Sequence, residues 1–87
     1  MTEYLAGPVK HSVTIAGHQT SLSLEPLFWE ALREEAARKS LPVNALIAQI
    51  DLERIGVEQP PNLASAIRLW LFQQRTNMFI DTHSQNS

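Results

Sequence analysis

The sequence predicts a mainly α fold in which one short strand leads directly into a helix. Residues 20–24 read Thr-Ser-Leu-Ser-Leu, and this strict alternation is typical of a strand with one apolar face. After Pro26 the spacing changes, because Phe28, Leu32 and Ala36 stand four residues apart, as on one face of a helix. Two later segments keep the helical spacing. The sequence therefore indicates one strand followed by three helices.

These elements divide the chain into three parts. We expect an N-terminal arm over residues 1–11, one domain over residues 12–76 and a flexible tail over residues 77–87. Within the domain we expect a strand over about residues 19–25 and helices over about residues 26–39, 43–55 and 62–76.

The helix boundaries rest on residues that cap or break helices. Pro26 is tolerated in a first turn, and Arg38 suits a carboxyl end. A tight turn over residues 40–42 separates the first two helices, and Ser40 is a candidate cap for the second. Asn62 is a candidate cap for the third helix.

Length and composition allow one small domain. The chain has 87 residues, of which 44% are hydrophobic and 18% charged, as in an ordinary globular protein. It contains no cysteine, which excludes disulfides and suits a reducing compartment. No positively charged start precedes an apolar run, and the longest nearly apolar stretch, around residues 67–72, is far too short to span a membrane. We expect a cytoplasmic protein with no membrane partner.

The distribution of charge is more informative than its sum. A net charge of −2 argues mildly against a general nucleic-acid binder, since such proteins are usually basic. No acidic residue lies between Glu3 and Glu25, however, whereas Lys10, His11 and His18 do. The strand end of the molecule is therefore its more positive end.

Catalytic, metal and cofactor sites are not expected. His11 and His18 are seven residues apart with no acidic or cysteine partner nearby, whereas a metal site needs three or four ligands in compact spacing. Glu34 and Glu35 indicate a solvated helix face, with Arg38 placed to pair with them. No phosphate-binding loop or nucleophile motif is present. We expect no enzyme activity, no catalytic residue, no metal and no cofactor.

The partner of the strand is the open question. Residues 13–16 are also β-prone, and Gly17 marks either a hairpin turn or a bulge in one longer strand. If this segment does not fold back, the partner must be the same strand of a second chain, paired antiparallel about a two-fold axis. Such a dimer would share a core, whose expected residues are Leu22, Leu24, Phe28, Leu32, Leu46, Ile47 and Ile50.

Alternation also predicts what the other face of the strand carries. Gln19, Ser21 and Ser23 must point away from the core into solvent. A ribbon of two such strands has about the size that enters the major groove of DNA.

The order of elements and the local motifs resemble a known family. The run GHQTSLSLEPLFWEALREEAARKSLPVNALIAQID resembles the ribbon-helix-helix domain of a small bacterial family related to the Arc and methionine repressors, and NLASAIRLWL resembles its additional downstream helix. The likeness covers about residues 10–75. It implies an intertwined homodimer with an intermolecular antiparallel ribbon, in which Gln19, Ser21 and Ser23 contact bases. It also implies that Val43 and Asn44 offer backbone N–H groups to a phosphate.

The sequence departs from that family at two positions. Gln19 stands where an arginine is common, and Pro42 where a serine cap is common. Gln19 can pair with adenine but carries no charge, so the departure predicts weaker and less salt-dependent DNA binding. From the arm, Lys10 and His11 are expected to add phosphate contacts.

Two functions follow as hypotheses. The first is a homodimer, or a tetramer when bound to DNA, that binds double-stranded DNA and represses transcription. The alternative is a protein-interaction or dimerisation module, antitoxin-like or an adaptor, with a protein partner and weak or no DNA binding. The acidic helices, the missing arginine and the additional helix favour this alternative.

Overall fold

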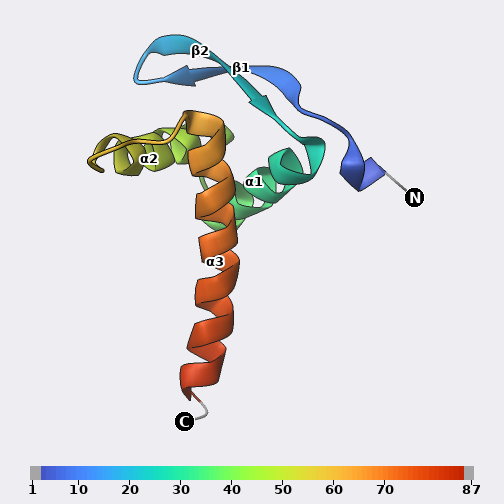
Figure 1. The fold of residues 1–87 in the computed structure, drawn as a ribbon, viewed down its shortest axis with the longest axis vertical. Coiled ribbons are helices and arrows are strands. Elements are labelled where there is room, and N and C mark those ends of the chain that lie inside the picture. Colours follow the sequence, from blue (N-terminus) through green and yellow to red (C-terminus); the bar gives the residue numbers. More distant parts are fainter. Residues whose placement is uncertain (1–2, 86–87) are drawn as a thin grey trace.

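The computed structural model describes the backbone of residues 3–85 and the side chains of residues 4–76. Two strands form an antiparallel hairpin that lies across one end of the three helices (Figure 1). The predicted fold class, a mainly helical chain in which strand precedes helices, is confirmed, although the chain has two strands where one was predicted. In chain order the elements are the 3₁₀ turn η1 (Glu3–Leu5), β1 (Val9–Ile15), β2 (His18–Leu24), α1 (Pro26–Arg38), α2 (Val43–Ile55) and α3 (Leu63–Gln85).

The hairpin answers the question that the sequence left open about the strand's partner. β1 folds back on β2 within the same chain, from the pair Val9 and Leu24 to the pair Ile15 and His18. The turn is the two-residue loop Ala16-Gly17, with φ angles of 51° and 82°. Positive φ at both positions is what a type I′ hairpin turn requires, because its twist matches that of the flanking strands. The ribbon seen here is therefore formed by one chain.

The first strand also changes the expected N-terminal boundary. β1 begins at Val9, so residues 9–11 belong to a strand rather than to the arm predicted over residues 1–11. The physical reason is strand pairing. Once the turn closes, the backbone of residues 9–11 lies beside residues 22–24 of the predicted strand and forms hydrogen bonds with them, which extends β1 to Val9.

The junction between α1 and α2 corrects one expectation about capping. The backbone N–H of Ser40 donates to the carbonyl of Ala37 at 3.0 Å, and that of Leu41 to the carbonyl of Ala36 at 2.8 Å. With Ser40 at a φ of 57°, this is the Schellman arrangement that ends a helix. Ser40 therefore ends α1 and does not cap α2. The N-cap of α2 is Pro42, which makes no side-chain capping hydrogen bond.

The third helix begins as predicted and extends further than predicted. Asn62 caps it, because its Oδ1 accepts a hydrogen bond of 2.8 Å from the N–H of Ser65. The helix continues to Gln85, into the segment predicted to be a tail, because no proline or glycine follows Pro61 to stop it. Residues 86–87 lie outside the described residues. Over residues 3–85, no helix combines the length and apolar character needed to cross a membrane.

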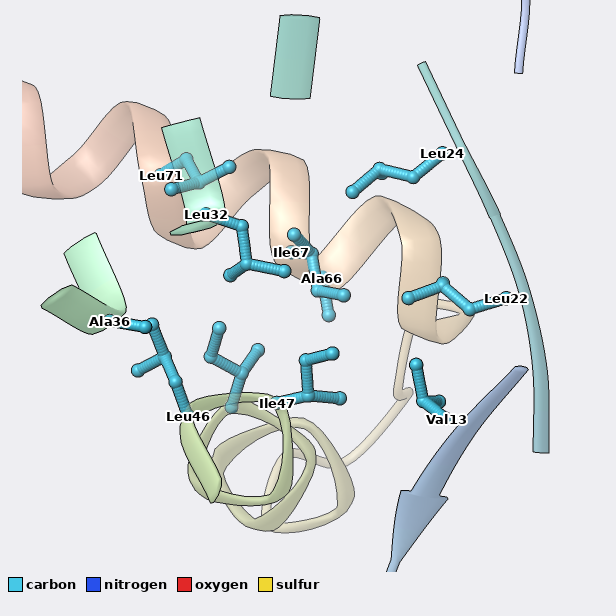
Figure 2. Close-up of a cluster of buried hydrophobic side chains, with 11 residues drawn as sticks. Val13, Leu22, Leu24, Leu32, Ala36, Leu46, Ile47, Ala66, Ile67 and Leu71 are labelled. Atoms are coloured by element: carbon cyan, nitrogen blue, oxygen red, sulfur yellow. The ribbon is translucent and has the colours of Figure 1, made fainter. Parts of the chain in front are cut away.

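The core lies between the inner side of the hairpin and the three helices. Figure 2 shows Val13, Leu22 and Leu24 extending from the two strands toward the helical side chains. Six of the seven residues predicted for a shared dimer core are buried within this single chain, and Phe28 is half-buried. The buried residues are Val13, Leu22, Leu24, Leu32, Ala36, Leu46, Ile47, Ile50, Ala66, Ile67 and Leu71.

Candidate nucleic-acid interface

The hairpin presents one face of polar side chains to solvent. Successive side chains of a strand point to opposite faces, so residues paired directly in register share a face. Three alternate pairs along the hairpin carry only polar, exposed side chains and no carboxylate. We call this set the outer face, and its pairs are Lys10 with Ser23, Ser12 with Ser21, and Thr14 with Gln19.

The orientation of the outer face is fixed by what the opposite face buries. Val13, Leu22 and Leu24 are only 2%, 3% and 0% exposed. A slip of the register by one residue would bring these side chains into water and the polar ones into the core. Burial of the inner face therefore holds the six polar side chains outward.

The structure brings most of the predicted DNA-contacting residues of the strand region together. Gln19, Ser21 and Ser23 lie on the outer face, as alternation predicts, and Lys10 joins them from β1. Ser12 and Thr14 were missed by sequence reasoning, although β1 alternates in the same way as β2. Hydroxyl, amide and ammonium groups side by side can donate hydrogen bonds to base edges and phosphates, and the hydroxyls and amide can also accept them.

His11 lies on the other side of the hairpin from Lys10. Its imidazole stacks on the indole of Trp29, with ring centroids 3.7 Å apart and planes 7° from parallel. It shares the inner side with Leu22, its partner in the register. His11 was predicted to contact a phosphate together with Lys10, and the structure separates the two residues. The ring instead fastens β1 to α1.

The amino end of α2 does not belong to the outer face. Val43 is half-buried and Asn44 is exposed, at the start of a helix that packs against the inner side of β1 (Figure 1). The carbonyl of Pro42 accepts from the N–H groups of Ala45 and Leu46, at 3.0 and 3.2 Å. The N–H groups of Val43 and Asn44 come before the first helical hydrogen bonds and have no acceptor within the helix. They point toward the helix's amino end, as an anion contact requires.

Most of the positive charge on the helices is neutralised locally. Three arginines pair with an acid three residues earlier on the same helix, at distances between 2.7 and 3.3 Å. These are partly or largely exposed pairs and contribute little to stability. Residues 9–24, in contrast, hold no acid at all. The pairs are Arg33 with Glu30, Arg38 with Glu35, and Arg54 with Asp51.

A fourth ion pair fixes the end of the hairpin to α3. The guanidinium of Arg68 donates to both carboxylate oxygens of Glu25, at 2.9 and 3.0 Å, and lies over the ring of Phe28. The hydrogen bonds from Arg68, and then that from the backbone of Glu25 itself, lower the pKa of the Glu25 carboxyl below its ordinary value. Because Glu25 directly follows β2, this pair positions the hairpin relative to the third helix.

Of three comparisons with known proteins, one gives a match. Neither the curated proteins nor the solved structures give a significant match to the chain. The model of the ribbon-helix-helix domain matches residues 8–75, from just before β1 into the second half of α3. Proteins with this domain generally bind DNA as transcription regulators or antitoxins, and they typically form dimers. With the match covering most of the chain, and a hairpin followed by helices in the structure, this protein belongs to the ribbon-helix-helix domain family.

Proposed function

We propose that this protein is a DNA-binding homodimer that represses transcription by placing the outer face of its hairpin in the major groove. The observation that carries the proposal is the composition of that face. Six exposed side chains, five of them neutral and polar and one a lysine, stand in register with no acid among them. A face of this kind can approach the negatively charged duplex and exchange hydrogen bonds with the bases.

The roles within the face follow from side-chain chemistry. Gln19 carries an amide, which can pair with adenine through two hydrogen bonds. Ser21 and Ser23 follow it on the same side of β2, and Ser12 and Thr14 lie across from them on β1. The short hydroxyl side chains let the backbone come close to the base edges while still offering a donor and an acceptor.

The dimer follows from the second edge of β2. One edge pairs with β1, and no other strand of the described chain covers the opposite edge. Pairing this edge with its copy about a two-fold axis joins the two outer faces into one sheet of four strands. At the usual strand spacing, the outermost strands are about 14 Å apart, wider than the major groove of about 12 Å, whereas the two central strands are only about 5 Å apart and can enter it. The two copies of β2 then face the base edges, and β1 flanks them.

Phosphate contacts follow from the same arrangement. Lys10 lies on β1, at the flank of the sheet, where the sugar–phosphate backbones run. The free backbone N–H groups of Val43 and Asn44 lie on the inner side of the hairpin. They would therefore bind a phosphate that lies past the edge of the sheet, and not one that faces its outer side. Because only one lysine per chain takes part, the salt dependence should be modest, with a slope of about 0.9 for each neutralised phosphate.

The test is selection of sequences from a randomised duplex pool, followed by anisotropy titrations of the selected site at several salt concentrations. We expect Gln19→Ala to weaken binding to the selected site by about 1–3 kcal/mol per lost pairing and to relax the preference at one position. Thr20→Ala is the matched control, since Thr20 is an exposed neighbour on the other face. Lys10→Ala should weaken binding to all sequences alike and reduce the salt slope.

Two outcomes would count against the proposal. Equal losses from Gln19→Ala and Thr20→Ala would remove the role given to the outer face. Absence of binding at low salt, in a folded dimer, would leave a protein-interaction module such as an antitoxin.

A further inference from the structure

A groove between α1 and α3, away from the hairpin, takes no part in the function proposed above. It has a volume of about 620 Å³. Figure 1 shows that α3 runs on past α1. Its apolar lining comes from both helices: Leu27, Phe28 and Ala31 of α1, and Leu71 and Phe72 of α3.

Two of these apolar side chains stand out from the groove into water. Phe72 is 71% exposed and Leu27 is 54% exposed. Burying an aromatic side chain is strongly favourable, so a solvated phenylalanine beside an open apolar groove indicates a surface that is covered in an assembly. The same patch therefore offers both a projecting side chain and a recess that can receive one.

The charges on the two walls of the groove are complementary. The wall formed by α1 carries Glu30, Glu34, Glu35 and Arg38, and the wall formed by α3 carries Arg75. Glu30 and Glu35 already pair with arginines of their own helix. Within the described residues, neither Glu34 nor Arg75 forms an ion pair.

We propose that this groove binds the same groove of a second copy of the chain about a two-fold axis. A two-fold contact needs one patch that is complementary to itself. This patch carries a projecting side chain, Phe72, a recess that can receive it, and opposite charges on its two walls. The rotation lays α3 of each copy over α1 of the other. Phe72 then enters the groove of the second copy, and Arg75 meets Glu34 of the second copy, each contact occurring twice.

This contact is distinct from the edge of β2, which is proposed above to pair two chains into the DNA-binding dimer. A chain that used both contacts would form an assembly larger than a dimer. The groove contact does not depend on DNA, so it is measured on free protein, and its failure would leave the DNA proposal untouched.

The first experiment is sedimentation velocity on the full chain without DNA, comparing Phe72→Asp with Leu69→Asp. Both residues are exposed on α3, at 71% and 63%, but Leu69 does not line the groove. We expect Phe72→Asp to halve the assembly mass and Leu69→Asp to leave it unchanged, with circular dichroism showing both variants folded. A wild-type assembly no larger than that of Phe72→Asp, or equal effects of the two substitutions, would overturn the proposal.

The second experiment uses charge reversal. Arg75→Glu and Glu34→Arg each place like charges together twice in the contact, so each alone should weaken self-association by about tenfold. When the two variants are mixed, their opposite charges meet again, and the mixed assembly should form more tightly than either variant alone. No gain on mixing would contradict the pairing of Arg75 with Glu34 and, with it, the two-fold groove contact.

Discussion

Substitution of Ile67 by alanine tests whether the third helix is part of the core. Ile67 lies on α3 with none of its side chain exposed, in the cluster that holds Leu24 and Leu32. The change removes three carbon atoms, which at about 0.8 kcal/mol for each buried methylene is about 2.4 kcal/mol of transfer free energy. A cavity closed in by three helices and the hairpin cannot collapse fully, so the total cost should be about 3–4 kcal/mol.

A loss of this size is large for a domain of 87 residues, whose whole free energy of unfolding should be about 4–13 kcal/mol. It corresponds to a fall in Tm of about 15 °C or more. Urea unfolding followed by the fluorescence of Trp29 and Trp70, at one fixed protein concentration, gives the free energy. Both indoles are half-buried against the core, so their emission should report its loss.

The matched control is Leu69→Ala on the same helix. Leu69 is 63% exposed, so its truncation should change the free energy of unfolding by no more than about 0.5 kcal/mol. If Ile67→Ala cost less than about 1 kcal/mol, or no more than Leu69→Ala, α3 would not contribute to the hydrophobic core.

Three further changes test individual contacts. Arg68→Met keeps the apolar stem over Phe28 but removes the partner that lowers the pKa of Glu25. This stabilisation is present at neutral pH and is lost as the pH falls through the lowered pKa, so wild type and variant should differ in urea midpoint at pH 7 and converge in acid, below that pKa. A constant difference at both pH values would assign the effect to packing alone. Ser40→Gly should stabilise the protein by about 0.5–1 kcal/mol in thermal unfolding, because glycine adopts the φ of 57° without strain; a destabilised variant would mean that the serine hydroxyl contributes more than the strain costs. Gly17→Val should cost about 1–2 kcal/mol, because valine is strained at the φ of 82° that this turn needs. A steric clash does not contribute, since a Cβ at Gly17 meets no atom within 4 Å. An unchanged urea midpoint would show that the turn does not need positive φ.

Local pattern was sufficient for most of the elements. The alternation at residues 20–24 and the four-residue spacing from Phe28 each depend on neighbours in sequence, and both predictions agree with the observed strand and helix. The cap at Asn62 is equally local, because its side chain bonds a backbone N–H three residues later. Gln19, Ser21 and Ser23 could be placed on the outer face for the same reason.

Features that depend on contacts distant in sequence were predicted less well. His11 was predicted to contact a phosphate from the arm together with Lys10, whereas only the packing of β1 on α1 brings its ring onto Trp29. Ser40 could cap a following helix or end the preceding one, and its positive φ, which is not visible in the residue type, determines that it ends α1. The pairing of Glu25 with Arg68 joins residues 43 positions apart and has no local signal.

The sequence by itself determined the order of the elements, the polar composition of the outer strand face and the absence of acid near it, because these follow from residue type and period. The tertiary structure decided which backbone pairs with β2, since a hairpin and an intermolecular ribbon satisfy the same hydrogen bonds. The turn at Ala16-Gly17 brings β1 back beside β2, and Val13 enters the core with Leu22 and Leu24. That burial places Ser12 and Thr14 beside the predicted DNA-reading residues, since in a paired strand the side that is buried fixes the side that is exposed.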